Sequence, residues 1–151
     1  MPRYAAAVRS ANTAATANNA AAVLWNPSGS RAIQLREVWC FKTAATADNQ
    51  ALVRATARGT QSTTVTPDAN TCFSDTKLAP ASGAVIDTAW SVQPTVAGTY
   101  LARANLPAAA GSGFVWVFSE PWVVKPGEGI ALVTPVATIL QASDITFVFD
   151  D

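Results

Sequence analysis

The stretch from Phe114 to Val133 limits what this chain can fold into more than any other. Its first half carries aromatic side chains at every second position, which is the period of a strand with one buried face: Phe114, Trp116 and Phe118. Pro121 then interrupts the strand, because proline has no N–H to donate to a ladder. Residues Pro126–Gly129 combine a fixed φ at proline with glycines that accept positive φ. The stretch therefore predicts two strands, a bend and a tight turn.

Short strands separated by Gly- and Pro-rich turns recur along the rest of the chain. The clearest runs from Ala32 to Lys42, and we expect its apolar residues to share one face: Ile33, Leu35, Trp39 and Phe41. Glu37 falls on the same face, so we expect it near an edge or paired with an arginine. Residues 134–142 predict a further short strand around Ile139. Strands at this spacing indicate an all-β sandwich or barrel.

Small residues dominate two segments, which predicts close packing against a neighbour. Residues 5–22 are mainly Ala, Asn and Thr, and we interpret them as an extended arm or a small-residue strand; a disordered tail is the alternative. Within Leu52–Thr60, one face carries almost only small side chains: Val53, Ala55, Ala57 and Gly59. We accordingly divide the chain into an N-terminal arm, residues 1–22, and a β-sandwich domain, residues 23–151.

Charge is scarce along the chain: 13% of its 151 residues are charged, against about 25% in a typical soluble domain. This deficit predicts that other subunits cover much of the surface, although a surface rich in Ala and Thr explains it equally well. The net charge is zero, so we expect no nucleic-acid partner, because such binding needs a basic patch. No apolar run approaches the roughly 20 residues of a membrane helix. Residues 1–25 do not resemble a signal peptide, so we expect no membrane partner and folding in the cytoplasm.

The chain offers little catalytic chemistry. It has no histidine, the commonest general base and metal ligand. Its two cysteines, Cys40 and Cys72, are too few for a zinc site, and we expect free, buried thiols with a disulfide as the alternative. The string Ser74–Lys77 matches the SxxK of acyl enzymes, but it lies in a turn-rich loop without companion motifs. We therefore predict no enzyme activity, no catalytic or metal-ligating residue and no cofactor.

Tryptophan is the most notable residue type, with five copies: Trp25, Trp39, Trp90, Trp116 and Trp122. Most lie among apolar residues of predicted strands, which favours a place in a core or a subunit interface. Trp90 and Trp122 are flanked by polar or bend residues, so they are the best candidates for exposure. An exposed indole ring can stack on sugar rings or bases, so a binding function stays open.

Two motifs suggest a family. Leu24–Ser30, LWNPSGS, precedes a hydrophobic strand, and Pro126–Leu132, PGEGIAL, forms a predicted hairpin. Together they resemble the small jelly-roll proteins found among the structural genes of tailed phages, over residues 20–150. The resemblance implies an antiparallel, jelly-roll-like β-sandwich with an extended N-terminal arm. It also implies a capsid decoration (cement) protein, a homotrimer on the outer surface of the virion, without catalytic residues.

The resemblance further implies two kinds of partner, namely other copies of the chain and the major capsid protein. We expect the chain to bridge adjacent capsid subunits through its N-terminal arm and one end of the sandwich. The predicted interface residues are Arg3, Tyr4, Val8, Arg9, Trp90 and Trp122. Domains of phage head and tail fibres look similar, so a receptor- or glycan-binding fibre domain is the alternative function.

Overall fold

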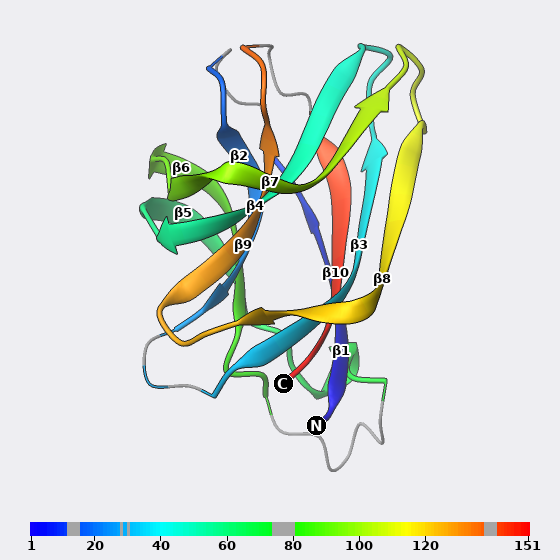
Figure 1. The fold of residues 1–151 in the computed structure, drawn as a ribbon. Helices are drawn as coiled ribbons and strands as arrows, with labels where there is room; N and C mark the ends of the chain where they lie inside the picture. Colours follow the sequence, from blue (N-terminus) through cyan, green and yellow to red (C-terminus); the bar gives the residue numbers. More distant parts are fainter. Residues whose placement is uncertain (12–15, 28, 30, 74–80, 138–141) are drawn as a thin grey trace.

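A computed structural model describes residues 1–11, 16–27, 29, 31–73, 81–137 and 142–151 (Figure 1). The described chain forms ten strands and one 3₁₀ helix: β1 Arg3–Arg9, β2 Asn19–Asn26, β3 Ile33–Lys42, β4 Asp48–Ala57, β5 Thr60–Val65, η1 Ala69–Thr71, β6 Val85–Val92, β7 Thr95–Leu106, β8 Gly113–Val124, β9 Glu128–Thr134 and β10 Ser143–Asp150. The strands build two antiparallel sheets, a four-stranded one ordered β1-β10-β3-β8 and a six-stranded one ordered β5-β6-β2-β9-β4-β7. The predicted all-β sandwich is confirmed.

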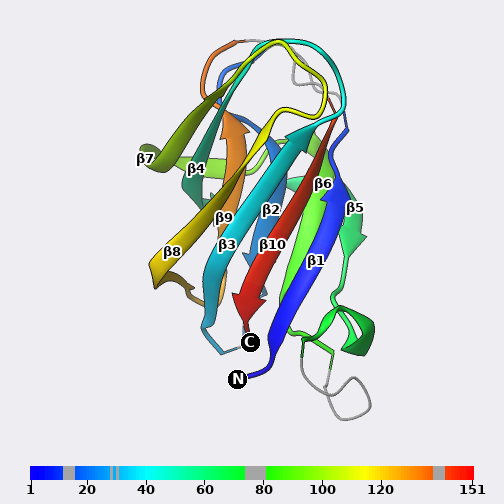
Figure 2. The same ribbon diagram turned by 90° about the vertical axis from the view of Figure 1, so that its right-hand side faces the viewer.

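The order of the strands is that of a jelly roll. Four antiparallel pairs follow one another: β4 with β7, β3 with β8, β2 with β9 and β1 with β10. Successive pairs alternate between the two sheets, as in a long two-stranded ribbon that is rolled up. The strands β5 and β6 are an addition between β4 and β7, and β6 extends the six-stranded sheet beside β2. Figure 2 shows the four-stranded sheet face-on.

The main core lies between the two sheets, because alternate residues of each strand point inward. Its largest fully buried side chains are aliphatic and aromatic residues from both sheets: Leu24, Ile33, Leu35, Leu52, Ile130, Leu132, Phe147 and Phe149. Burial of each such side chain stabilises the fold by about 1.5–3 kcal/mol. Cys40 belongs to this core as well.

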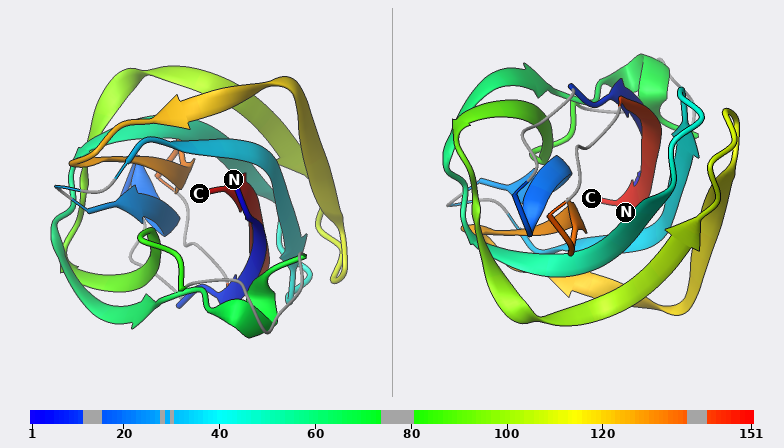
Figure 3. Two further views of the ribbon diagram at one scale, coloured as in Figure 1. Left: turned by 90° about the horizontal axis from the view of Figure 1, so that it is seen from below. Right: turned by 90° about the horizontal axis from the view of Figure 1, so that it is seen from above.

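A second core lies on the other side of the six-stranded sheet. Residues of β2, β4 and β9 that point away from the main core are also buried: Ala20, Val23, Trp25, Ala51, Val53, Ala55, Ala131 and Val133. The segment Trp90–Tyr100, which ends β6 and begins β7, packs over them, and we call it the cover segment. Seen along the long axis, β2 and β9 lie in the middle of the molecule (Figure 3). The close-packed neighbour predicted for the small residues of β4 is therefore part of the same chain.

Specific polar contacts hold the cover segment and β6 in place. The fully buried Asp87 accepts hydrogen bonds from Arg58 Nε at 2.7 Å, Arg58 Nη2 at 2.8 Å and Thr64 Oγ1 at 2.7 Å. The amide of Ala20 donates to Gln93 Oε1 at 2.9 Å. Gly59 has a φ of +73°, and a Cβ on it would lie 2.3 Å from the carbonyl oxygen of Val92, so only glycine fits there.

The N-terminal residues belong to the sandwich, which corrects the prediction of a separate arm over residues 1–22. Residues Arg3–Arg9 form β1, which pairs with β10 along its whole length. Residues Asn19–Asn26 form β2, a strand inside the six-stranded sheet. The alternative interpretation, a small-residue strand packed closely on something else, describes both. Four of their alanines are buried, namely Ala6 in β1 and Ala20, Ala21 and Ala22 in β2.

A bulge in β3 changes which residues face the core. In the pairing with β10, Leu35 and Glu37 lie opposite the adjacent residues Phe149 and Val148, so Arg36 is an extra residue in β3 and exchanges the two faces of the strand beyond that point. Ile33 and Leu35 point inward, as predicted, but Trp39 and Phe41 point outward, and Val38 and Cys40 take the inward positions. The prediction that one face carries all four apolar residues is wrong for this reason.

The organising stretch of the sequence behaves largely as predicted. Residues 118–121 of β8 have no partner in β3, so the ladder is interrupted where Pro121 lies. Gly127 adopts a φ of +78° in the turn between β8 and β9. The strand predicted around Ile139 and the string Ser74–Lys77 lie outside the described residues.

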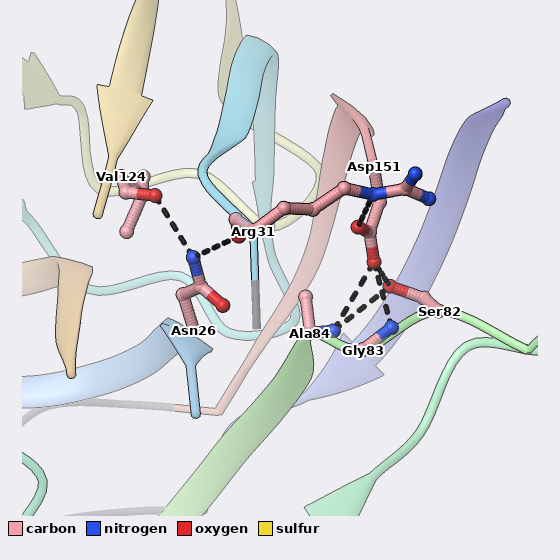
Figure 4. Close-up of polar contacts among 7 residues, drawn as sticks. All are labelled: Asn26, Arg31, Ser82, Gly83, Ala84, Val124 and Asp151. Atoms are coloured by element: carbon pink, nitrogen blue, oxygen red, sulfur yellow. Dashed lines mark hydrogen bonds and ion pairs between the residues drawn. The ribbon is translucent and has the colours of Figure 1, made fainter. Parts of the chain in front are cut away.

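Polar groups tie loops to strands at the end of the sandwich that holds both chain termini (Figure 4). The side-chain amide of Asn26 donates to the carbonyl oxygens of Arg31 and Val124 at 2.8 and 3.0 Å. One carboxylate oxygen of the buried Asp151 accepts from Ser82 Oγ at 2.6 Å and from the amide of Gly83 at 2.7 Å. Burial opposes ionisation of Asp151, but these hydrogen bonds outweigh it and hold its pKa below the usual value.

Candidate functional site

The outward face of the four-stranded sheet, which we call the open face, exposes apolar side chains. The exposed fractions are 68% for Val117, 49% for Val115 and 42% for Phe41. Trp39 lies directly beside Val115 in the β3–β8 ladder and is partly exposed. We call Trp39, Phe41, Val115 and Val117 the apolar stripe. Contiguous exposed apolar residues of this kind are typical of interaction surfaces.

Charged pairs border the apolar stripe on the β1–β10 side of the open face. Arg9 donates to both carboxylate oxygens of Asp144, at 2.7 and 2.9 Å, and the pair is exposed. Asp150 accepts from Arg3 Nε at 2.7 Å and from Arg36 Nε at 2.8 Å. Burial opposes ionisation of Asp150, but the two arginines outweigh it and keep its pKa below the usual value. The bordering charges are thus paired and held in fixed positions.

A hollow of about 290 Å³ opens on the same face, next to the apolar stripe. Its lining combines two charged and three apolar side chains: Arg3, Glu37, Trp39, Phe73 and Val148. Trp39 Nε1 donates to Glu37 Oε2 at 2.8 Å, which fixes the indole ring along β3. Phe73 reaches the hollow because its amide donates to the carbonyl oxygen of Arg3 at 2.8 Å and Cys72 forms a bridge with Tyr4.

The predicted interface residues of the N-terminal segment divide between two faces of β1. Arg3 and Arg9 lie on the open face. Tyr4 and Val8 point into the main core, where Tyr4 is fully buried and stacks on Phe149 at a centroid distance of 5.6 Å. Because side chains alternate along a strand, one strand cannot present all four residues to a partner. The prediction of Tyr4 and Val8 as interface residues is therefore corrected.

The two tryptophans predicted to be exposed do not line the hollow, and both are partly buried. Trp90 packs against the second core. Trp122 packs against the main core, edge-on to Phe118, and the guanidinium of Arg54 lies 5.9 Å from its ring centre. Neither indole N–H meets an acceptor among the described residues. Flanking polar residues misled the prediction, because Ser91 beside Trp90 is the extra residue of a bulge in the β5–β6 pairing, and Pro121 beside Trp122 marks the bend of β8.

Sequence reasoning missed the residues that build the open face. Trp39 and Phe41 were predicted to share one face with Ile33 and Leu35, and the bulge after Leu35 turns them to the opposite, outward face. Val115 and Val117 alternate with the aromatic residues of β8, so the sequence indicated that they share the opposite face. It did not indicate that this face is left exposed. Phe73 follows a loop, and no sequence pattern indicates that it returns to β1.

Other chemistry is sparse in the part of the chain that the structure describes. Cys40 and Cys72 are free and buried, as predicted, and burial raises the pKa of Cys40 to about 12. No group of three or more metal-ligating side chains occurs among the described residues. Likewise, none of the helices in the described ranges is long and apolar enough to cross a membrane.

Comparison with known proteins gives no relative from which a function could be taken. No protein-family model, no curated protein and no solved structure matches this chain. The open face and its geometry therefore stand as the principal evidence on function.

Proposed function

We propose that this protein is a structural protein of a phage virion, which decorates and stabilises the capsid as a homotrimer bound to the major capsid protein. The observation that carries the proposal is the apolar stripe on the open face. Val117, Val115 and Phe41 expose large apolar side chains from one continuous sheet surface, bordered by paired charges. Subunit interfaces have this composition, with an apolar centre and a polar rim.

The fold and the composition support the same proposal. Double-sheet jelly rolls occur in viral capsid domains and lectins, although a fold alone does not define a function. The share of charged residues, 13%, suits a subunit whose surface is covered by other protein. The resemblance of the Leu24–Ser30 and Pro126–Leu132 motifs to phage decoration proteins supports the virion as the location.

The proposed mechanism is stabilisation by mass action. A protein that binds the assembled shell and has no affinity for free subunits lowers the free energy of the shell alone. Binding through several copies of one symmetric oligomer adds the individual affinities by raising the effective concentration. In this account the part of the open face formed by Phe41, Val115 and Val117 packs against copies of the chain and the capsid, and Arg3 and Arg9 lie at its rim.

The test is reconstitution on phage heads assembled without this protein. We expect the purified chain to sediment with such heads and to raise the temperature at which they break open. The variant Val117→Asp places a charge in the apolar stripe and should abolish both effects. Val92→Asp is the matched control, because Val92 is 59% exposed on the other sheet. Head binding that survives Val117→Asp, or is lost equally in Val92→Asp, contradicts the proposal.

A further inference from the structure

The hollow beside the apolar stripe is lined by charged as well as aromatic side chains, and packing against another protein subunit does not require this combination. The stripe is apolar, whereas the hollow brings a carboxylate and a guanidinium together with two aromatic rings: Arg3, Glu37, Trp39 and Phe73. We propose that the hollow binds a neutral saccharide. This inference goes beyond the proposed role in decoration and does not depend on it.

Charge decides the class of ligand. The charged groups in and next to the hollow are Arg3, Arg36, Asp150 and Glu37, two positive and two negative. Both arginines donate to Asp150, and Glu37 accepts from Trp39 Nε1 at 2.8 Å. A site with balanced, paired charges gives no net attraction to an anion or a cation. It therefore favours an uncharged ligand.

The lining suits a ligand with apolar faces and a polar edge. Trp39, Phe73 and Val148 supply apolar surface, and Phe73 is 64% exposed, so its ring is accessible. Among the described residues, the hydrogen bond from Trp39 leaves Glu37 Oε1 without a donor, and Arg3 Nη1 has no acceptor. A sugar hydroxyl can donate to the carboxylate oxygen and another can accept from the guanidinium. A sugar ring also offers C–H faces that pack on aromatic rings.

Size agrees with a small saccharide. The volume of about 290 Å³ is just below the usual range of small-molecule sites, which is about 300–1,000 Å³. Such a hollow holds one sugar ring with its substituents and leaves the rest of a longer glycan in solvent. The site is largely preformed, because the Trp39–Glu37 bond and the Arg3–Asp150 pair fix the side chains that would contact the ring.

The experiment is a binding assay of the full chain against a panel of neutral disaccharides, maltose, lactose, cellobiose and chitobiose, with 3′-sialyllactose as an acidic probe. Saturation-transfer NMR detects the bound sugar, and a change in the total tryptophan fluorescence of the chain is a second readout. We expect a neutral disaccharide to bind with a Kd of about 1 mM. Phe73→Ala should weaken this binding about fivefold, because it removes one aromatic contact. Because the Phe73 ring is exposed, we expect Phe73→Ala to fold as the parent chain does.

Two further variants make the assay specific. Glu37→Gln keeps an acceptor for Trp39 Nε1 but removes the charge, so it should weaken sugar binding while the fold is retained. Val115→Ala, in the apolar stripe and outside the hollow, should leave sugar binding unchanged. The proposal is overturned if no neutral disaccharide binds, if Phe73→Ala and Glu37→Gln bind as the parent does, or if the acidic probe binds at least as tightly. Repeating the assay in Val117→Asp, which we expect to be a monomer, tests sugar binding when no neighbouring subunit can cover the hollow.

Discussion

On the outward side of the six-stranded sheet the chain buries Val53 beneath its own cover segment, whereas on the outward side of the four-stranded sheet it leaves Val117 exposed. The first face consists of alanines and valines with a tryptophan, and the second carries Phe41, Val115 and Val117 in the open. The difference teaches that low charge in this sequence has two causes. One apolar surface is buried within the monomer, and the other is exposed in the monomer and is the one that we propose a partner covers.

The largest expected effect comes from removing the ion pair between Arg58 and Asp87, which holds β6 beside the covered face. Arg58→Ala leaves the fully buried Asp87 carboxylate without its guanidinium. Because Arg58 is itself about a third exposed and solvent replaces part of the interaction, we expect a loss of about 2–3 kcal/mol in the free energy of unfolding. Urea denaturation measures it. Arg9→Ala, which breaks the exposed pair with Asp144, is the control and should cause no measurable change.

A matched pair of valines sharpens the comparison further. Val53→Ala removes two methyl groups from the second core and should cost about 2 kcal/mol. Val117→Ala removes the same groups from the open face and should change the stability of the monomer by less than about 0.5 kcal/mol. Urea denaturation at low protein concentration gives both values. Equal losses at the two positions would show that the open face is buried in the monomer.

The stability of the protein at low pH tests the charged pairs at the border of the open face. The pKa of Asp150 is lowered in the folded protein, so its contribution is present above the unfolded value of about 3.9 and is lost as the pH falls through the folded pKa. We expect Asp150→Asn to reduce stability at pH 7 by about 1 kcal/mol and to flatten the loss of stability below pH of about 4. Urea denaturation of both proteins at several pH values measures the slopes, and identical slopes would contradict this account.

The smallest expected effect concerns Ala89, the residue of β6 directly before the cover segment. Ala89 has a φ of +58°, a left-handed conformation that is unfavourable for alanine. Ala89→Gly relieves this strain but makes the unfolded chain more flexible, so we expect a net gain of about 0.5 kcal/mol. Thermal unfolding measures it. A clear loss of stability would indicate that the Ala89 methyl group packs in the second core.

Sequence patterns predicted well where the strands lie, but they predicted poorly which strands pair with one another. Alternation in Phe114–Phe118 identified β8, and turn chemistry placed Gly127 correctly. The pairing of β1 with β10 joins residues nearly a chain length apart, and no local pattern in Arg3–Arg9 indicates it. The bulge after Leu35 depends on the partner strand, so period-2 reasoning assigned Trp39 to the wrong face.

The candidate site was less predictable than the fold, because it too depends on contacts between segments that are distant in the sequence. The segment Trp90–Tyr100 covers one of the two apolar faces, and the position where it packs is set by tertiary contacts rather than by local sequence. The hollow joins Arg3 from β1, Glu37 from β3 and Phe73 from the segment after η1. Sequence singled out Arg3 alone among them as an interface residue, and it assigned exposure to Trp90 and Trp122, which pack on the two cores.

Sedimentation velocity over a wide range of protein concentration tests most directly whether the open face needs a partner. We predict that the parent chain sediments as a trimer, that Val117→Asp sediments as a folded monomer, and that Val92→Asp behaves as the parent. A parent chain that stays monomeric at every concentration, or a Val117→Asp variant that still forms the trimer, would contradict the account.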